Sequence, residues 1–435
     1  MTSRKRSILV LILLTLGVLS MIFLAGCGTK TETTTTAGGG GTVTTAANVT
    51  YTGEDLVIGA INSITGVNAL TGAEHKWAQE QAVADKNAAG GITLADGKTH
   101  KIVLKYVDDK SSDTEAAAAM EKLIKSDGIE IVLSSNTTPY NQAAATVAEQ
   151  YQAYFHICTS WIDDASPDGK NPGFIGGMNL KWSSDVFESA AESGLAAIGG
   201  AKALPATDQP KIFAVMTENN PDGVGFGDAT KAGLEAAGYT VASYEKFVEG
   251  NKDFSSIILK FKQANVDGLV CLISPADGIT FVKQMKEQNY SPKFMFGWKG
   301  FWPTEFMTAL GADSNYMGHD GFWSEDNGAP GSKELGEAFK AEHDGLDSVS
   351  IGLSYASVQI MAQAIMAAGS TDPTAVRDAV FGGTFKGTTM GDVTYTEAGI
   401  CDVQPYGLWW KDGKRVVYWP DQGNKWEPFV PWDQR

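Results

Sequence analysis

The sequence predicts an α/β fold of two lobes, each built on a parallel, doubly wound sheet. About 380 residues follow an N-terminal leader and linker, which is too many for one compact core. Within them, short apolar runs alternate with amphipathic helical segments, the pattern of strands joined by helices in a parallel sheet. The alternation starts again after about Lys181, so the chain contains two similar halves.

The first 26 residues have the features of an export signal. A basic start, Arg4–Arg6, precedes an apolar stretch from Ile8 to Leu19, and small residues then lead into Cys27. This pattern indicates a targeting segment rather than a folded helix. Its end resembles a bacterial lipobox, which implies a lipoprotein signal peptide over 1–26, cleavage before Cys27 and lipidation of that cysteine.

Two or more acyl chains would hold the protein on a bilayer, because each buried methylene contributes about 0.8 kcal/mol. The alternative is an uncleaved N-terminal anchor, and either interpretation places the folded part outside the cytoplasm. Residues 27–52 are rich in Thr and Gly, including Thr33–Thr36 and Gly38–Gly41. Such a segment buries too little apolar surface to fold, so we expect a flexible tether.

Charge and cysteine content exclude several classes of partner and cofactor. Residues 1–26 hold three basic and no acidic residues, so the rest of the chain has 31 Lys and Arg against 51 Asp and Glu, a net charge of −20. Nucleic-acid binding needs a basic face and is not expected. Cys158, Cys271 and Cys401 show no disulfide or zinc spacing, so we expect buried thiols, no metal site and no cofactor.

The first half predicts four strands and three helices in alternation. The segment 115–125 shows the pattern clearly, because Ala116, Met120 and Leu123 share one helical face. The expected helix over 72–89 ends at the glycine pair Gly90-Gly91. The expected strands are 56–61, 102–107, 129–134 and 153–158, and the expected helices are 72–89, 115–125 and 139–150.

The second half repeats the alternation and ends in a hairpin. Val358, Met361 and Ile365 share one face of a strongly apolar helix over 354–368. Aromatic and β-branched residues flank Lys411–Lys414 and predict a hairpin over 408–419. The other expected helices are 183–199, 223–237, 254–264 and 277–288, and the expected strands are 211–217, 240–247, 266–273 and 293–296.

These elements divide into two lobes. Lobe 1 is expected to contain residues 53–180 plus 323–386, and lobe 2 residues 181–322 plus 387–435. In open α/β sheets, ligands bind beyond the carboxyl ends of the strands. Two such sheets place the natural site in the cleft between the lobes, where ligand binding can drive hinge closure.

Four strand-to-helix loops carry polar groups toward that cleft. They are Ser63–Gly72, Ser134–Pro139, Cys158–Trp161 and Glu218–Gly225. In the second loop, Thr138 suits a helix N-cap and the next residue, a proline, suits the first turn. Hydroxyls and free N–H groups at a helix start favour a carboxylate, although plain capping explains the same pattern.

The ordered series of segments resembles the Leu/Ile/Val-binding protein family of type I periplasmic binding proteins. The segments are "DLVIGAINSITGVNALTG", "NAAGGI", "DDKSSDTEAAAAMEKLI", "KDFSSIILKFKQANVDGLV" and "SYASVQIMAQAI", within residues 54–420. No single motif decides the match. The resemblance implies a two-lobed flytrap fold without catalysis, a small-molecule ligand, an ABC transporter permease as partner and a monomeric chain.

The resemblance also implies the ligand-binding residues. A hydroxyl of Thr138 or Thr137 falls where the family holds the ligand carboxylate, and Thr159 and Trp161 complete that contact. Thr71 and Asp222 fall at positions that are often aromatic in the family. The remaining expected contacts come from the same loops and from the loop near residue 298: Asn136, Ser160, Trp298 and Lys299.

Lys299 departs from the family, whose amino-acid binders carry an acid there for the ligand ammonium. A lysine repels an ammonium and attracts a carboxylate. One hypothesis is therefore a ligand with a second anionic group, or an aromatic acid held by Trp161, Trp298 or Trp302. In the alternative, Lys299 points to solvent and Asp222 or Asp277 takes the ammonium.

Catalytic and cofactor motifs are absent from the sequence. The five histidines show no HExxH spacing, no G-x-S-x-G or Walker A run occurs, and Gly223–Gly227 lacks the full dinucleotide register because Asp228 takes the last position. The expected function is an extracytoplasmic, lipid-anchored solute-binding lipoprotein of an ABC importer, not an enzyme, with a small polar or anionic, carboxylate-bearing ligand. The alternatives are an extracellular sensor acting through a membrane receptor and, less compatible with the motifs, a secreted hydrolase.

Overall fold

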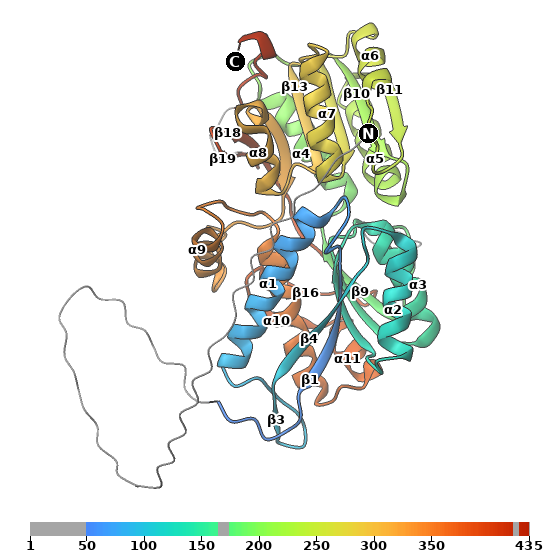
Figure 1. The fold of residues 1–435 in the computed structure, drawn as a ribbon, viewed down its shortest axis with the longest axis vertical. Coiled ribbons are helices and arrows are strands. Elements are labelled where there is room, and N and C mark those ends of the chain that lie inside the picture. The colour runs from blue at the N-terminus through green and yellow to red at the C-terminus, as the bar shows by residue number, and fades with distance from the viewer. Residues whose placement is uncertain (1–48, 164–173, 421–425, 435) are drawn as a thin grey trace, which may run out of the picture. The chain divides into compact units, whose positions relative to one another are not determined.

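The computed structural model describes residues 49–163, 174–420 and 426–434 (Figure 1). Most of its strands pair in parallel. The expected signal peptide, the lipidated Cys27 and nearly all of the tether lie outside these residues. Residues Ala46–Arg435 group into one unit by their contacts. This unit contains two large sheets of six and seven strands.

The first sheet is parallel throughout. Its central strands are short and fully buried, as the apolar runs in the sequence predict. Ile58 of the first strand pairs with Leu104, and Ala60 pairs with Leu133 of its other neighbour. In spatial order the strands are β17 (Ile400–Asp402), β9 (Ser183–Phe187), β6 (Tyr154–Cys158), β5 (Ile131–Ser135), β1 (Leu56–Asn62) and β4 (Ile102–Asp108).

The second sheet is parallel in its first five strands and antiparallel at one edge. The predicted hairpin forms that edge, because its two strands pair antiparallel with each other and the first also pairs antiparallel with β14. In spatial order the strands are β11 (Thr240–Phe247), β10 (Ile212–Glu218), β12 (Gly268–Ile273), β13 (Phe294–Lys299), β14 (Met317–Gly321), β18 (Tyr406–Lys411) and β19 (Lys414–Trp419).

Helices cover both faces of the first sheet, as a doubly wound fold requires. One face packs against α2 (Asp113–Lys125) and α3 (Thr138–Tyr151), and the other against α1 (Ala69–Ala88), α10 (Ile351–Ala368) and α11 (Pro373–Val380) (Figure 1). The apolar α10 is long enough to cross a membrane, but here it is a mostly buried core helix that packs on α1.

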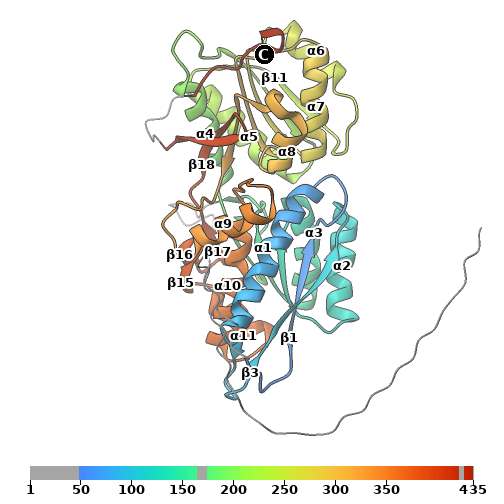
Figure 2. The same cartoon turned by 60° about the vertical axis from the view of Figure 1, so that its left-hand side comes forward.

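The second sheet is covered in the same way. One face packs against α6 (Ser255–Gln263), α7 (Pro275–Glu287) and α8 (Thr304–Leu310), and the other against α4 (Ala190–Ala203) and α5 (Pro221–Ala236) (Figure 2). A further helix, α9 (Ser332–Glu342), packs near α1. The smaller elements are the pairs β2 (Ile92–Thr93) with β3 (Thr99–His100), β7 (Ile162–Asp163) with β8 (Phe174–Ile175) and β15 (Thr384–Thr388) with β16 (Gly391–Thr394), and the 3-10 turns Gly311–Ser314 and Trp432–Gln434.

The predicted helix over 183–199 is wrong in its first part. Residues Ser183–Phe187 form β9 and pair with β6, and α4 begins only at Ala190. The Ser189 side chain accepts a hydrogen bond from the Glu192 amide and caps that helix. Five consecutive buried residues show no alternation, so the sequence alone merges this inner strand with the helix after it.

The chain passes between the two sheets three times. Because β9 and β17 belong to the first sheet, we propose crossings at 188–189, 322 and 403–405, in place of the expected 180, 322 and 386. Phe187, Trp302 and Phe322 pack together at the first two crossings, with ring centroids 4.9–6.2 Å apart. These rings join buried side chains of both sheets into one continuous cluster.

Cys158, Cys271 and Cys401 are buried, free thiols, as predicted. Burial raises the pKa of the Cys158 thiol to about 12, so this sulfur is unreactive at neutral pH.

Candidate functional site

A narrow cavity lies where strands of the two sheets end at their carboxyl termini, the place the topology predicts. About 20 Å³ of it is open to a water-sized molecule, roughly the room that one water needs. One part of its wall is apolar and the rest is polar. The lining residues are Ser63, Asn68, Thr71, Gly72, His75, Ser135, Asn136, Thr137, Thr159, Phe187, Asp222, Phe226, Leu272, Lys299 and Trp302.

The N-terminus of α3 points a hydroxyl and an amide at the site. Thr137, rather than the expected Thr138, is the N-cap, and its side chain makes no capping hydrogen bond. The Thr138 amide donates to Oδ1 of Asp222 at 3.3 Å, from the opposite sheet. A carboxylate therefore already occupies the start of α3, which is the position favoured for an anion.

One face of α1 forms the neighbouring wall. Asn68, Thr71, Gly72 and His75 are spaced three, four and seven residues apart and therefore share this face. A Cβ at Gly72 would overlap the carbonyl oxygen of Ser63, so glycine permits the close approach of α1 to the first loop.

Four lining residues carry a buried polar atom that has no hydrogen-bond partner in the described part of the chain. These atoms are Oδ1 of Asn68, Oγ1 of Thr71, Nε2 of His75 and Oγ1 of Thr137. Buried polar groups in native proteins are nearly always paired, and each unpaired group costs about 1–3 kcal/mol. Their convergence on one cavity indicates groups that await a polar ligand.

Lys299 is the centre of a buried charge cluster on the opposite wall. Its Nζ lies 2.8 Å from Oε2 of Glu218, 3.3 Å from Oε1 of Glu249 and 3.8 Å from Oδ2 of Asp222. The residue is only 2% exposed. Three carboxylates thus surround one ammonium, and the cluster is rich in negative charge.

The cluster shifts the acidity of its members. Burial raises the pKa of the Glu218 carboxyl to about 7, against the opposing effect of the Lys299 charge. Burial likewise raises the pKa of Asp222, whereas Lys299 and hydrogen bonds outweigh burial and lower the pKa of Glu249. The acids raise the pKa of Lys299 well above its ordinary value despite its burial, so the lysine is charged.

The expectation that Lys299 points to solvent is wrong, because the residue is buried. Carboxylates of its own chain already compensate its charge, which argues against a second ligand anion, and the class of ligand stays a prediction. Asp277, the other candidate for an ammonium, accepts from the Gly250 amide at 2.6 Å and does not line the cavity. Asp222 does line it.

Further contacts join the loops of the two sheets around the cavity. Glu249 accepts hydrogen bonds from Nδ2 of Asn68 and from the Tyr140 hydroxyl, each at 2.9 Å. The Trp161 indole donates to the Pro221 carbonyl at 3.2 Å, and a Cβ at Gly225 would overlap its ring. Gly225 of α5 therefore makes room for the ring of Trp161.

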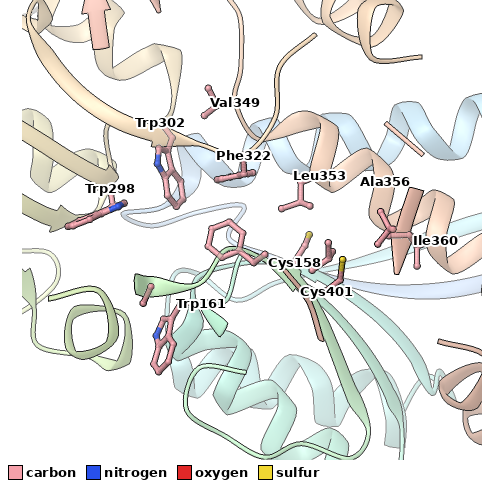
Figure 3. Close-up of a cluster of buried hydrophobic side chains, with 14 of the residues drawn as sticks. Cys158, Trp161, Trp298, Trp302, Phe322, Val349, Leu353, Ala356, Ile360 and Cys401 are labelled. Atoms are coloured by element: carbon pink, nitrogen blue, oxygen red, sulfur yellow. The ribbon is translucent and has the colours of Figure 1, made fainter. Parts of the chain in front are cut away.

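Six of the ten residues expected to bind ligand line the cavity, and four do not. Ser160 and Thr138 lie behind the wall: Oγ of Ser160 accepts from Asn141, and Oγ1 of Thr138 accepts from the Trp161 amide. Trp298 is a core side chain of β13 whose indole bonds Ser193, and Figure 3 shows it in the same buried cluster as Phe322. The six that line the cavity are Thr71, Asn136, Thr137, Thr159, Asp222 and Lys299.

Sequence reasoning missed Asn68, His75, Glu218 and Glu249 as members of the site. The helical spacing of residues 68, 71 and 75 offered a signal for the first two, because it places them on the face that carries Thr71. No spacing links Glu218 and Glu249 with Lys299. Within the described ranges, no group of three or more His, Cys, Asp or Glu side chains could hold a metal ion.

Comparisons with known proteins agree with this fold. A family model described as "Periplasmic binding protein" matches residues 55–406. The Leu/Ile/Val-binding protein homolog 1 of Brucella abortus is 30% identical over 369 residues, covering 84% of this chain and 92% of the relative.

Two solved structures share the fold at low identity. A leucine-binding protein of Thermotoga maritima is 18% identical with a TM-score of 0.72, covering 83% of this chain and 97% of the other. A solute-binding protein of an ABC transporter from Rhodopseudomonas palustris, in complex with benzoate, is 16% identical with a TM-score of 0.68, covering 87% and 98%. Both similarities concern the arrangement of strands and helices.

Proposed function

Since the chain belongs to the periplasmic binding protein family, we propose that it captures a small, amino-acid-like solute between its two sheets and delivers it to an ABC importer. Members of this family bind solutes and are not enzymes. The relatives' names mention leucine, isoleucine and valine, and the benzoate complex shows that the same fold also accepts an aromatic acid.

The four unpartnered polar atoms of the cavity wall carry the proposal. They lie in a space that also contains one acid, Asp222, and one base, Lys299, beside the apolar side chains of Phe187, Phe226 and Trp302. A solute with a carboxylate, an ammonium and a small apolar part complements such a wall.

The start of α3 supports a specific orientation of that solute. The carboxylate takes the place that Asp222 occupies, where it accepts from the Thr138 amide and the Thr137 hydroxyl. Asp222 then turns its charge to the solute ammonium. This assignment restores the amino-acid-like ligand that an unpaired Lys299 had argued against.

Lipid anchoring through Cys27, the tether over 27–52, a monomeric chain and a cognate permease complete the proposal. The lipobox-like sequence supports the anchor. A Cys27→Ser variant should appear in the soluble fraction of the producing cells, while the unchanged chain stays with membranes. Delivery of the solute to a membrane receptor is the alternative, and ligand-dependent ATP hydrolysis by a reconstituted permease would favour transport.

Native mass spectrometry of the purified protein, followed by calorimetry, tests the proposal. We expect a co-purified solute of small mass, or binding of at least one zwitterionic amino acid with a rise in melting temperature. If a broad panel of amino acids and aromatic acids gives neither binding nor a thermal shift, the proposed ligand class is wrong.

A further inference from the structure

Hydrogen bonds outside the cavity fix the chemical character of two side chains on the α1 face. Nδ1 of His75 lies 2.5 Å from the carbonyl oxygen of Ser135, which can only accept a hydrogen bond. The proton of the neutral ring is therefore on Nδ1, and Nε2 is left as an acceptor. Burial lowers the pKa of His75 to about 4, so the ring is neutral at physiological pH.

Asn68 is oriented by the same logic. Its Nδ2 donates to the Tyr140 hydroxyl at 3.0 Å and to Oε1 of Glu249 at 2.9 Å. A carboxylate oxygen cannot donate, so the amide must present its nitrogen there and its oxygen to the cavity. Oδ1 of Asn68 and Nε2 of His75 are the atoms without partners among the described residues.

The α1 face thus presents two neutral acceptors, with the hydroxyl of Thr71 between them in the helical order. All three residues are at most 8% exposed, so water from bulk solvent does not compensate them. An acceptor pair without charge suits neutral O–H or N–H donors, whereas the charged Asp222 on the opposite wall suits the ammonium. A purely aliphatic side chain would leave all three groups unpaired.

We propose that the α1 face is a donor-recognising subsite in which His75 and Asn68 accept hydrogen bonds from a hydroxyl or amide group of the solute side chain. The inference rests on the function proposed above and narrows it. The solute is an amino-acid-like molecule with a polar, donor-bearing side chain, and His75 is the residue that discriminates it from an aliphatic solute of the same shape.

Isosteric amino-acid pairs test the subsite by calorimetry. L-Threonine and L-valine differ by a hydroxyl in place of a methyl group, and L-asparagine and L-leucine differ by an amide in place of an isopropyl group. Wild-type protein should bind the polar member of at least one pair about tenfold or more tightly, because a site with buried acceptors rejects an analogue that cannot pair them.

Three variants separate recognition from structure. His75→Phe should reduce the preference to about threefold or less, and His75→Gln, which retains an acceptor, should keep more of it than His75→Phe. If His75→Phe does not fold, Thr71→Val replaces it. This variant is nearly isosteric, leaves the hydrogen bond between His75 and Ser135 intact and should also reduce the preference for the polar amino acid. Melting curves of each variant report on folding.

The binding results separate failure of the proposed subsite from failure of the proposed function. Equal or tighter binding of valine and leucine by the wild-type protein, with ratios unchanged in the variants, overturns the subsite but leaves an amino-acid-binding protein. Failure of all four amino acids to bind overturns both the subsite and the amino-acid-like ligand.

Discussion

The Asp222 carboxylate caps α3 from the opposite side of the cleft: its Oδ1 accepts a hydrogen bond from the Thr138 amide at 3.3 Å. The helix α3 follows β5 of the first sheet, and Asp222 lies in α5, which follows β10 of the second sheet. This contact therefore connects the two halves without a ligand. It also places a carboxylate where the proposed solute would bring its own.

The capping contact predicts that Asp222→Ala favours an open arrangement of the ligand-free protein. The variant removes the acceptor that α3 finds across the cleft, and the helix start then needs water. Small-angle scattering without ligand should give a larger radius of gyration than for the wild-type protein. Asp228→Ala, an exposed position on the same helix α5, should not change it. Equal radii for all three proteins would show that the contact does not hold the halves together.

Asp222→Asn should weaken binding of a zwitterionic amino acid about tenfold to a hundredfold. The asparagine can still accept from the Thr138 amide but carries no charge for the solute ammonium, and a hydrogen bond to a charged group contributes about 1.5–3 kcal/mol. Calorimetry with any amino acid that binds the wild-type protein measures the loss. Unchanged affinity would mean that the ammonium binds elsewhere.

Lys299→Met should destabilise the protein by about 3–5 kcal/mol at neutral pH, because it leaves buried carboxylates without their cation. Lys299 lowers the pKa of Glu218, Asp222 and Glu249, so all three pKa values rise when the lysine is removed. A raised folded-state pKa gives stability that is present at acidic pH and lost as pH rises. Urea unfolding should therefore show a larger deficit at pH 8 than at pH 5.

Lys252→Met is the matched control for that experiment. Lys252 is exposed and lies 3.8 Å from Asp277, so its removal should cost about 0.5 kcal/mol or less. If Lys299→Met loses little unfolding free energy, or loses the same amount at both pH values, the charge cluster as described is contradicted.

The sequence predicts the order of elements well and the site only in part. Short buried runs and helical periodicity locate most strands and helices, and the strand ends then indicate Asn136, Thr137, Thr159 and Asp222, which do line the cavity. The carboxylate partners of Lys299 were not predictable in this way. Its partners lie 81 and 50 residues earlier in the chain, and only the fold brings them together.

Local signals also failed where burial removes periodicity. Ser183–Phe187 is buried at every position, and an Ala- and Gly-rich segment follows it, so strand and helix appeared continuous. The polar face of α1 had a usable signal in its helical spacing. It remained unassigned because an isolated His75 without metal-ligand spacing resembles a core residue.

Gly225→Ala should separate the two halves without unfolding either. A Cβ at this position would overlap the ring of Trp161, which belongs to the loop after β6, while alanine itself favours the helix by about 0.5–1 kcal/mol. Scattering should show a larger radius of gyration, with an unchanged or higher melting temperature. Val224→Ala, an exposed neighbour, serves as control. A variant as compact as the wild-type protein would show that Trp161 can move aside.

Glu188→Gln should make the protein less sensitive to alkaline pH. Glu188 lies at the first crossing between the sheets, is fully buried, and has its pKa raised well above the ordinary value by burial and then by the charge of Asp320. Asp320 is held by the Trp302 indole and the Ser193 hydroxyl, each at 2.5 Å. Because the two acids repel each other when both ionise, the folded state retains a proton that the unfolded chain releases.

The sign of this effect follows from the raised pKa. Stability from the retained proton is complete below the unfolded pKa of about 4.3 and is lost as pH rises toward the folded value, by about 1.4 kcal/mol for each pH unit. Glutamine has no proton to lose, so urea unfolding of the variant should change less between pH 5 and pH 8.5 than that of the wild-type protein. Glu334→Gln, at an exposed position of α9, should retain the wild-type dependence. If the wild-type protein and Glu188→Gln show parallel pH profiles, Glu188 does not hold the retained proton.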